Sequence, residues 1–197
     1  PLSDSQILRL VDSIKNPKWR FAIQLLSTFG LRPEDLKHLH TRNNGKELWS
    51  DYRKSKGGKK GETTEPRQLF PLFVQDIDST PINWNLKERI HLREELPPLN
   101  DANSVGQAVG RFLRDKKVWQ QLKEEALAER QQCVPYSFRH RYSYVGHNRQ
   151  KEDGTYRAPK QIADAMGHSL DVHLASYSRF MTKELAKNFD QEKIEVN

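Results

Sequence analysis

The sequence predicts a mainly helical protein with a small antiparallel β-sheet or hairpin. Apolar residues recur at helical spacing through most of the chain, whereas short aromatic and branched runs occur only between Gly45 and Leu72. The 197 residues are enough for one good-sized domain, and 8 Phe, 6 Tyr and 4 Trp are enough for one core. The net charge of +7 is only a weak indication of a polyanionic partner.

The first third of the chain predicts three helices. Ser3 or Asp4 can cap the first, which is amphipathic. The second is more apolar and stops at Gly30, a residue that commonly ends helices. Pro33 suits the first turn of a third helix with the sequence PEDLKHLH.

The segment between Gly45 and Leu72 predicts a β-hairpin with a mobile basic loop. The runs ELWSDYR and PRQLFPL read as strands, and KSKGGKKGETT between them is rich in Gly, Lys and Thr. Such a charge run is usually a solvated surface, but on a DNA-binding protein it would lie on the phosphate backbone. Its basic residues are Arg53, Lys54, Lys56, Lys59 and Lys60.

Helical patterns return in the second half of the chain. They cover LKERIHLREEL, a longer stretch from about Ser104 to Arg130, and SFRHRYSYVGH. Residues 148–157 are polar and predict a loop. The next helix, KQIADAM, ends at Gly167, and Ser169 can cap the last one, LDVHLASYSRFM. Residues 181–197 predict a tail that needs a partner surface, such as a neighbouring protomer, to become ordered.

Several classes of function are disfavoured. No apolar run approaches the roughly 20 residues that a membrane span needs, and the chain does not start with a secretion signal, so we expect a soluble protein. The single Cys133 rules out an intramolecular disulfide and favours a reducing compartment. The histidines lack a metal-ligand spacing such as His-Glu-x-x-His, and no phosphate-binding Gly-x-x-x-x-Gly-Lys loop is present. We therefore expect neither metal-dependent hydrolysis nor ATP-driven chemistry.

Four local features carry groups that suit phosphodiester chemistry, and the basic hairpin is one of them. A second is GLRPEDL, where Asp35 can fix the guanidinium of Arg32 at a corner between helices, although an ordinary surface ion pair is the simpler interpretation of this motif alone. A third is YSFRHR, with Arg139 and His140 early in a helix whose N-terminal amides favour an anion.

The fourth feature is MGHS followed by a tyrosine. His168 lies at a turn between helices, and Tyr177 follows nine residues later within the second helix. Tyr177 could equally be a core aromatic residue, because Leu170, Leu174 and Met181 share its helical face.

Taken together and in this order, the four features resemble the tyrosine recombinase (phage integrase) family. GLRPEDL resembles its first arginine motif, and the SKGG hairpin resembles its catalytic lysine turn. YSFRH stands where the family usually has a His-x-x-Arg-His sequence, and MGHS with the Tyr177 helix resembles its C-terminal motif. The resemblance runs from about Phe21 to Phe180 and implies the catalytic-domain fold of DNA breaking-rejoining enzymes.

The resemblance also implies a role for each residue. Tyr177 would be the nucleophile, Arg32 and Arg139 would clamp the scissile phosphate, and His168 would donate a hydrogen bond to it. Lys56, or alternatively Lys54, would protonate the leaving 5′-oxygen. The supporting residues would be Tyr136, His140 and Asp35, and the DNA contacts would be Arg53, Lys54, Lys59 and Lys60.

Two departures from the family pattern concern this site. Tyr136 stands where histidine is most common, and a tyrosine can donate a hydrogen bond to phosphate but cannot carry a positive charge. The 29-residue interval from Arg139 to His168 is longer than the family pattern, with residues 148–157 as the expected insertion.

The implied activity is site-specific recombination or integration of DNA through a 3′-phosphotyrosyl intermediate, without metal, ATP or other cofactor. The implied partners are double-stranded DNA and further copies of the chain, as a tetramer on DNA, with no membrane. The location would be the cytoplasm or nucleoid of a prokaryote, as part of a phage or mobile element. Residues 1–197 would form a single catalytic domain, and the family's N-terminal DNA-binding domain would be absent from this chain.

Two alternatives remain open. The chain could be a sequence-specific DNA-binding protein on the same scaffold whose catalysis is weakened or lost, as Tyr136 suggests. It could also relax DNA in the manner of a type IB topoisomerase, since the same functional groups would serve that reaction.

Overall fold

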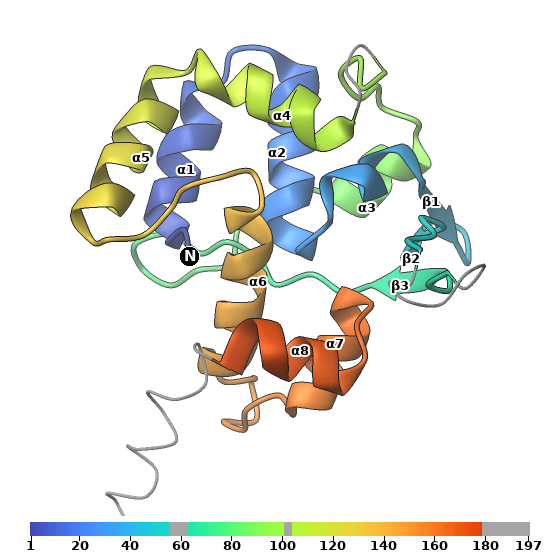
Figure 1. Ribbon diagram of the computed structural model, residues 1–197. Coiled ribbons are helices and arrows are strands. Elements are labelled where there is room, and N and C mark those ends of the chain that lie inside the picture. The colour runs from blue at the N-terminus through green and yellow to red at the C-terminus, as the bar shows by residue number, and fades with distance from the viewer. Residues whose placement is uncertain (56–62, 101–103, 179–197) are drawn as a thin grey trace, which may run out of the picture. The chain divides into compact units, whose positions relative to one another are not determined.

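The computed structural model describes residues 1–55, 63–100 and 104–178. The chain falls into two compact units, which divide after Tyr142. Over the described residues it forms eight α-helices and one three-stranded antiparallel sheet (Figure 1). The predicted fold class, mainly helical with a small antiparallel sheet, is therefore confirmed. No helix in these ranges combines the length and the apolar character that crossing a membrane requires.

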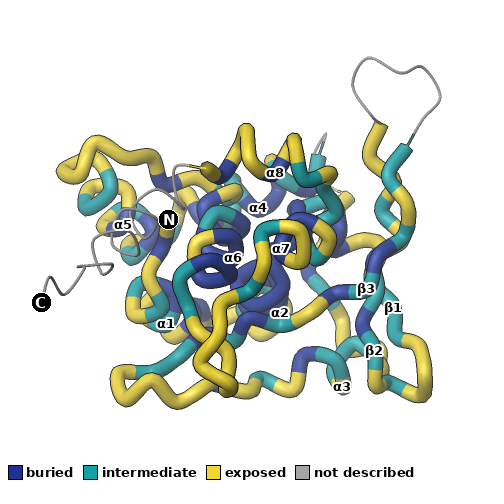
Figure 2. The backbone as a smooth tube through the Cα atoms, turned by 90° about the horizontal axis from the view of Figure 1, so that it is seen from below, coloured by how far each residue is buried: buried dark blue, intermediate teal, exposed yellow. Residues whose placement is uncertain are grey.

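Two N-terminal helices, α1 (Asp4–Ser13) and α2 (Pro17–Phe29), confirm the first two predicted helices. Ser3 is the cap of α1, because its Oγ accepts a hydrogen bond from the Gln6 N–H at 3.2 Å. Every residue from 21 to 29 of α2 is buried, which makes this helix the centre of the first unit's core (Figure 2).

The end of α2 depends on Gly30. Its φ of +58° is in the left-handed region that ends many helices. A Cβ at this position would lie 2.4 Å from Cγ of Tyr142, so a larger residue cannot be accommodated without a shift. The turn into the next segment is therefore both tight and closely packed.

The predicted third helix, PEDLKHLH, is wrong beyond its start. Pro33–Lys37 forms a short 3-10 helix, η1, and the chain then enters strand β1 (Leu39–Arg42). The helix does not continue, because residues 39–42 pair instead with a second strand, β2 (Glu47–Ser50). These interstrand hydrogen bonds are non-local, so the local helical pattern did not indicate them.

The sheet has the order β1-β2-β3, with β3 at Arg67–Leu69. The predicted hairpin corresponds to β2 and β3, which are antiparallel with Leu48 opposite Leu69. Beyond the strands the two arms stay paired, since Ser55 bridges Thr63. The tip of the predicted loop, residues 56–62, lies outside the described residues.

Three further helices complete the first unit: α3 (Leu86–His91), α4 (Val105–Arg114) and α5 (Lys117–Ala128). The predicted helix LKERIHLREEL is too long, because Arg93 has a φ of +58° and the Arg89 guanidinium pairs with Glu94 at 2.7 Å, which folds the chain back. The stretch from Ser104 to Arg130 is helical but divides into α4 and α5.

Helix α6 (Ser137–Asn148) begins in the first unit and ends in the second. The first unit holds it through Arg141, whose Nε and Nη2 donate to Asp4 at 2.9 and 2.7 Å. The same guanidinium donates to the carbonyl oxygens of Leu72 and Phe73 at 2.6 and 2.9 Å. Arg141 is fully buried and is thus a structural cation beside the predicted site residues Arg139 and His140.

The second unit contains α7 (Pro159–Met166) and α8 (Leu170–Tyr177). Both helices are confirmed at the predicted stops and caps, with Gly167 at φ +67° after α7 and the Ser169 side chain accepting from the Val172 N–H before α8. Residues 149–158 form no helix or strand, in agreement with the predicted loop. The predicted tail, 181–197, lies outside the described residues.

Candidate functional site

Three arginines surround one carboxylate in the first unit. Arg32 precedes η1, Arg67 begins β3, and Arg139 lies in the first turn of α6. Their residues are 7, 8 and 0% exposed, and Asp35 among them is 0% exposed. Buried charges of one sign in excess are rare in proteins unless a partner compensates them, so this cluster is the main candidate for ligand binding in the unit.

Asp35 organises the cluster through four hydrogen bonds. Its Oδ1 accepts from Ser50 Oγ at 2.6 Å and from Arg67 Nη1 at 3.1 Å. Its Oδ2 accepts from Arg67 Nη2 at 2.7 Å and from the backbone N–H of Arg32 at 2.7 Å. Burial acts to raise the pKa of Asp35, but the charge and hydrogen bonds of Arg67 and the Ser50 hydroxyl outweigh it, and the pKa is lowered.

The bidentate partner of Asp35 is therefore Arg67, which the sequence analysis missed. Asp35 accepts a hydrogen bond from the backbone of Arg32, but its bidentate ion pair is with Arg67, which is 32 positions away in the sequence. The sequence shows an arginine at the start of the second arm of the hairpin, but only the strand pairing brings it to Asp35.

Arg139 is oriented by the corner that Gly30 makes. Its Nη1 donates to the Gly30 carbonyl oxygen at 2.5 Å. That carbonyl is at the C-terminal end of α2, where the helix dipole favours a cation. The tight turn at Gly30 and the position of the Arg139 guanidinium thus depend on each other.

The cluster carries more positive than negative charge. Burial, followed by the charges of Arg139 and Arg67, lowers the pKa of Arg32 to about 10, against the attraction of Asp35. Arg32 stays protonated near neutral pH, so its guanidinium is repelled by those of Arg139 and Arg67. An anion bound beside them would relieve this repulsion, and guanidinium forks fit phosphate geometry well.

Tyr136 and His140 lie at the start of α6, beside this cluster. Their rings make an edge-to-face contact with centroids 5.4 Å apart. Tyr136 is 39% exposed, and its phenol is close enough to Arg32 to favour the charged guanidinium. The first unit therefore brings together four of the predicted residues: Arg32, Asp35, Tyr136 and Arg139.

The second unit brings together the other two predicted catalytic residues that are described. The rings of His168 and Tyr177 are stacked, with centroids 5.7 Å apart and planes at 14°. Tyr177 is 2% exposed, whereas Leu174 is 36% exposed. Tyr177 is therefore buried, as the alternative of a core aromatic residue requires, but Leu174 does not share its buried face, which consists of His173 and Tyr177.

His173 and His147 were missed by the sequence analysis. His173 lies one turn before Tyr177, with ring centroids 5.0 Å apart, and its Nε2 lies 2.9 Å from Nε2 of His147 on α6. Burial lowers the pKa of His147, which favours the neutral imidazole. The helical spacing of His173 and Tyr177 was a usable signal, whereas nothing local connects His147 to either. Within the described ranges, no three His, Cys, Asp or Glu side chains are arranged to hold a metal ion.

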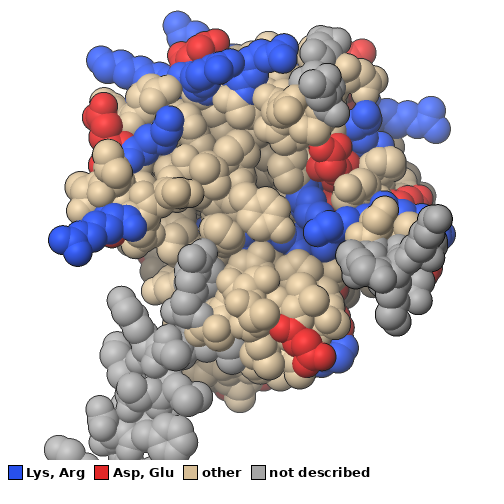
Figure 3. Space-filling view, in the orientation of Figure 1, with Lys and Arg blue, Asp and Glu red and all other residues tan. Residues whose placement is uncertain are grey.

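The predicted DNA-contacting residues are described only in part. Arg53 and Lys54 are exposed on the arm that follows β2, and the Lys54 carbonyl pairs with the Thr64 N–H at 2.9 Å. Lys56, Lys59 and Lys60 lie outside the described residues. Basic side chains also occur on the visible face around α4 and α5 (Figure 3). These helices and the link between them carry Arg111, Arg114, Lys116, Lys117 and Lys123.

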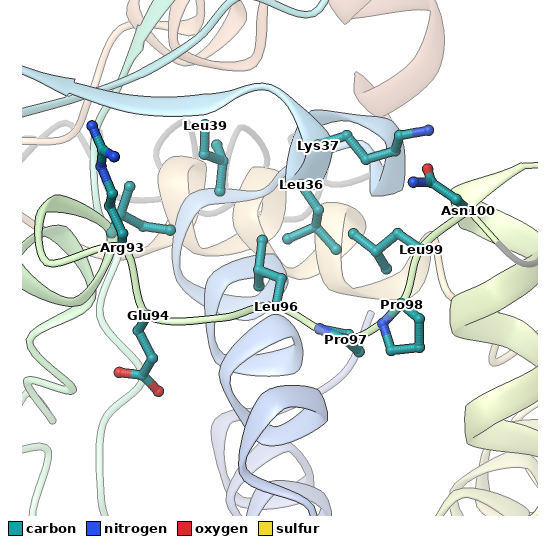
Figure 4. Close-up of a pocket in the computed structure, with 11 residues that line it drawn as sticks. Leu36, Lys37, Leu39, Arg93, Glu94, Leu96, Pro97, Pro98, Leu99 and Asn100 are labelled. Carbon is teal, nitrogen blue, oxygen red and sulfur yellow. The ribbon is translucent and has the colours of Figure 1, made fainter.

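A separate groove of about 520 Å³ lies between η1, α3 and residues 92–100. Leu36, Leu96 and Leu99 point toward one another across it, while Lys37 and Glu94 lie at its rim (Figure 4). None of the residues of the arginine cluster lines it. Its floor is apolar, and its lining also includes the cations Lys37 and Arg93.

Comparisons of the chain with protein-family models, with curated proteins and with solved structures find no match. The functional argument therefore rests on the residues and their geometry.

Proposed function

We propose that this chain is the catalytic domain of a site-specific DNA recombinase or integrase that cleaves and rejoins DNA through Tyr177. The buried arginine cluster is the observation that carries the proposal, because its excess positive charge and guanidinium geometry suit a phosphodiester. The stacked pair of His168 and Tyr177 supports it, since it places a buried phenol against an imidazole at the family-like spacing. The ordered motifs that resemble the tyrosine recombinase family, and with them its catalytic-domain fold, belong to the same proposal.

In the proposed reaction the Tyr177 oxygen attacks the scissile phosphorus, and the phenol proton passes to solvent. The bond from phosphorus to the 5′-oxygen breaks, and a lysine of the basic hairpin, Lys56 or Lys54, protonates the leaving oxygen. Arg32 and Arg139 stabilise the negative charge that develops on the non-bridging oxygens, and His168 donates a hydrogen bond to one of them. The phosphotyrosyl bond conserves the energy of the phosphodiester, so a 5′-hydroxyl can reverse the step without ATP.

The proposal requires the groups of both units to act on one phosphate in the DNA complex. It also includes the partners that such a reaction needs: double-stranded DNA and, for strand exchange, a tetramer of this chain on two sites. Its expected setting is the DNA of a prokaryote, phage or mobile element.

The first experiment traps the covalent intermediate. The full-length gene product is incubated with nicked duplexes prepared from the genome that carries the gene, so that the short 5′-hydroxyl fragment is lost after cleavage. We expect protein–DNA adducts that survive SDS and converge on one sequence, and that disappear in Tyr177→Phe and Arg139→Gln. Tyr156→Phe is the matched control, because Tyr156 is 44% exposed and belongs to neither cluster.

A second candidate function is sequence-specific DNA binding with little or no catalysis. Tyr136 favours it, because the position that usually carries histidine in the resembled family holds a group without positive charge. In the same experiment this alternative gives enrichment of one sequence by salt-dependent binding, with no SDS-stable adduct. That result would overturn the proposed recombinase activity.

A further inference from the structure

The end of α6 is tied to α8 by a pair of buried histidines beside the proposed nucleophile. His147 is 8% exposed and His173 is 0% exposed, and their Nε2 atoms are 2.9 Å apart. The ring of His173 also contacts the ring of Tyr177, with centroids 5.0 Å apart and planes tilted by 33°. His147 therefore reaches Tyr177 through one intervening ring.

The short distance between the two nitrogens restricts their protonation. A hydrogen bond between two Nε2 atoms needs one N–H donor and one lone pair, so one of the rings must have its Nε2 deprotonated. The bond fixes the tautomer of His173 relative to His147 and also the plane of its ring. Because the pair is buried, replacing either nitrogen with carbon leaves the other without this partner.

Two imidazoles contact the ring of Tyr177 and each other, so that the three rings form a compact triangle. His168 from the turn before α8 stacks on the Tyr177 ring at 14°, and His173 from one turn earlier in α8 contacts it at 33°. His168 and His173 also contact each other, with centroids 5.9 Å apart. A tyrosine that must attack in line needs its ring held in this way, since small displacements of a reacting group cost about 100-fold in rate.

We propose that His147 and His173 are positioning residues that fix the orientation of the Tyr177 ring for attack, with His147 acting through His173. The catalytic consequence rests on the proposed function, whereas the effect on the Tyr177 ring does not. His147 and His173 make no contact with the DNA in this proposal, and their contribution is the geometry of the nucleophile.

The first arm of the test measures the ring itself without DNA. Histidines are labelled with ¹⁵N and tyrosine rings with ¹³C, and NMR spectra of the wild type, His147→Phe and His147→Gln are compared near neutral pH. We expect one protonated and one bare Nε2 in the wild-type pair. We also expect a changed His173 tautomer signal and a shifted Tyr177 ring signal in His147→Phe. Gln places an amide where Nε2 lies, so His147→Gln should restore both signals toward the wild type.

The second arm measures single-turnover adduct formation on the trapped DNA sequence. We expect His147→Phe and His173→Phe to lower the rate constant by about 10- to 100-fold with DNA affinity unchanged, and His147→Gln to recover most of the rate. His91→Phe is the matched control, because His91 is an exposed histidine of α3 that bonds Thr41 in the first unit. Far-UV circular dichroism identifies any variant that fails to fold. If His173→Phe does not fold, the comparison between His147→Phe and His147→Gln decides the test.

The outcomes separate the two proposals. If the Tyr177 ring signal does not move in folded His147→Phe, or if His147→Gln behaves like His147→Phe, the positioning role is wrong. If the ring responds as expected and the wild type forms no DNA adduct, the positioning role stands and the recombinase activity is wrong. If the ring moves but folded His147→Phe and His173→Phe cleave at the wild-type rate, the orientation is unimportant for attack and the inference is overturned.

Discussion

At the scale of single residues, Asp35 is the group on which the arginine cluster depends. It neutralises Arg67, fixes the backbone of Arg32 and accepts a hydrogen bond from the Ser50 hydroxyl. Removing its charge leaves the Arg67 guanidinium buried without a counter-charge. Breaking one side of a buried pair costs about 3–5 kcal/mol, whereas a surface pair contributes little.

We therefore expect Asp35→Asn to lower the free energy of unfolding by about 3–5 kcal/mol in urea denaturation. Asp12→Asn, which changes an exposed aspartate of α1, should leave it almost unchanged. The effect should also depend on pH. Because the pKa of Asp35 is lowered in the folded state, its contribution is complete above the unfolded value of about 3.9 and is lost as the pH falls below it. Equal acid sensitivity of wild type and Asp35→Asn would contradict this role.

The arginine cluster also predicts stabilisation by anions. An anion bound to the folded state raises stability by linkage, by about 2.7 kcal/mol at a hundred times its dissociation constant. Inorganic phosphate should thus raise the melting temperature more than chloride at equal ionic strength, and Arg139→Gln and Arg32→Gln should lose this difference. Arg53→Gln, at an exposed position, should keep it. The same phosphate effect in the cluster variants and the wild type would show that the anion binds elsewhere.

At the scale of elements, the corner between α2 and η1 determines where Arg139 lies. Gly30→Ala combines a left-handed backbone, which costs about 1–2 kcal/mol, with a clash against the Tyr142 ring. We expect this variant to lower the free energy of unfolding by at least about 2 kcal/mol more than its control does. It should also reduce the rise in melting temperature that phosphate causes, since Gly30 carries the carbonyl that Arg139 contacts. Gly154→Ala is the control, because Gly154 has a φ of +77° with no atom within 4 Å of the added Cβ. Similar losses in both variants would mean that the Tyr142 contact is unimportant.

The same elements show what sequence patterns can predict. The starts of α1 and α8 and the stops of α2 and α7 follow from the local capping residues Ser3, Ser169, Gly30 and Gly167, and these predictions are confirmed. Strand β1 could not be predicted this way, because it exists through pairing with β2, and PEDLKHLH has a helical pattern of its own. The apolar pattern on α8 was misleading, because Leu174 is 36% exposed whereas His173 is buried and contacts the ring of Tyr177.

The residues of the candidate site likewise fall into those that sequence motifs predict and those that only the fold brings together. Arg32, Arg139, His168 and Tyr177 were identified by motif order, and each lies in one of the two clusters. Arg67, Ser50, His147 and His173 complete those clusters through contacts between residues 15 to 32 positions apart. The contacts of Arg67, Ser50 and His147 require the fold, whereas the helical spacing of His173 and Tyr177 is a local signal.

At the scale of the whole molecule, the proposed function predicts salt-dependent association with DNA, with which the net charge of +7 is compatible. Each phosphate contact contributes about 0.9 to the slope of log affinity against log salt. Replacing Arg53 and Lys54 with glutamine should therefore lower that slope by up to about 1.8 in fluorescence anisotropy titrations. Replacing Lys151 and Lys160 in the second unit removes the same charge and serves as the control. An unchanged slope in the first variant would remove the basic hairpin arm from the DNA interface.

The residue to which cleaved DNA becomes attached identifies the nucleophile, which we propose is Tyr177. The SDS-stable protein–DNA product is digested with trypsin and nuclease, and mass spectrometry locates the nucleotide on the peptide. The proposed function predicts a 3′-linked nucleotide on the Tyr177 oxygen and none in Tyr177→Phe. A nucleotide on another residue, or no covalent product on DNA that contains the binding sequence, would contradict it.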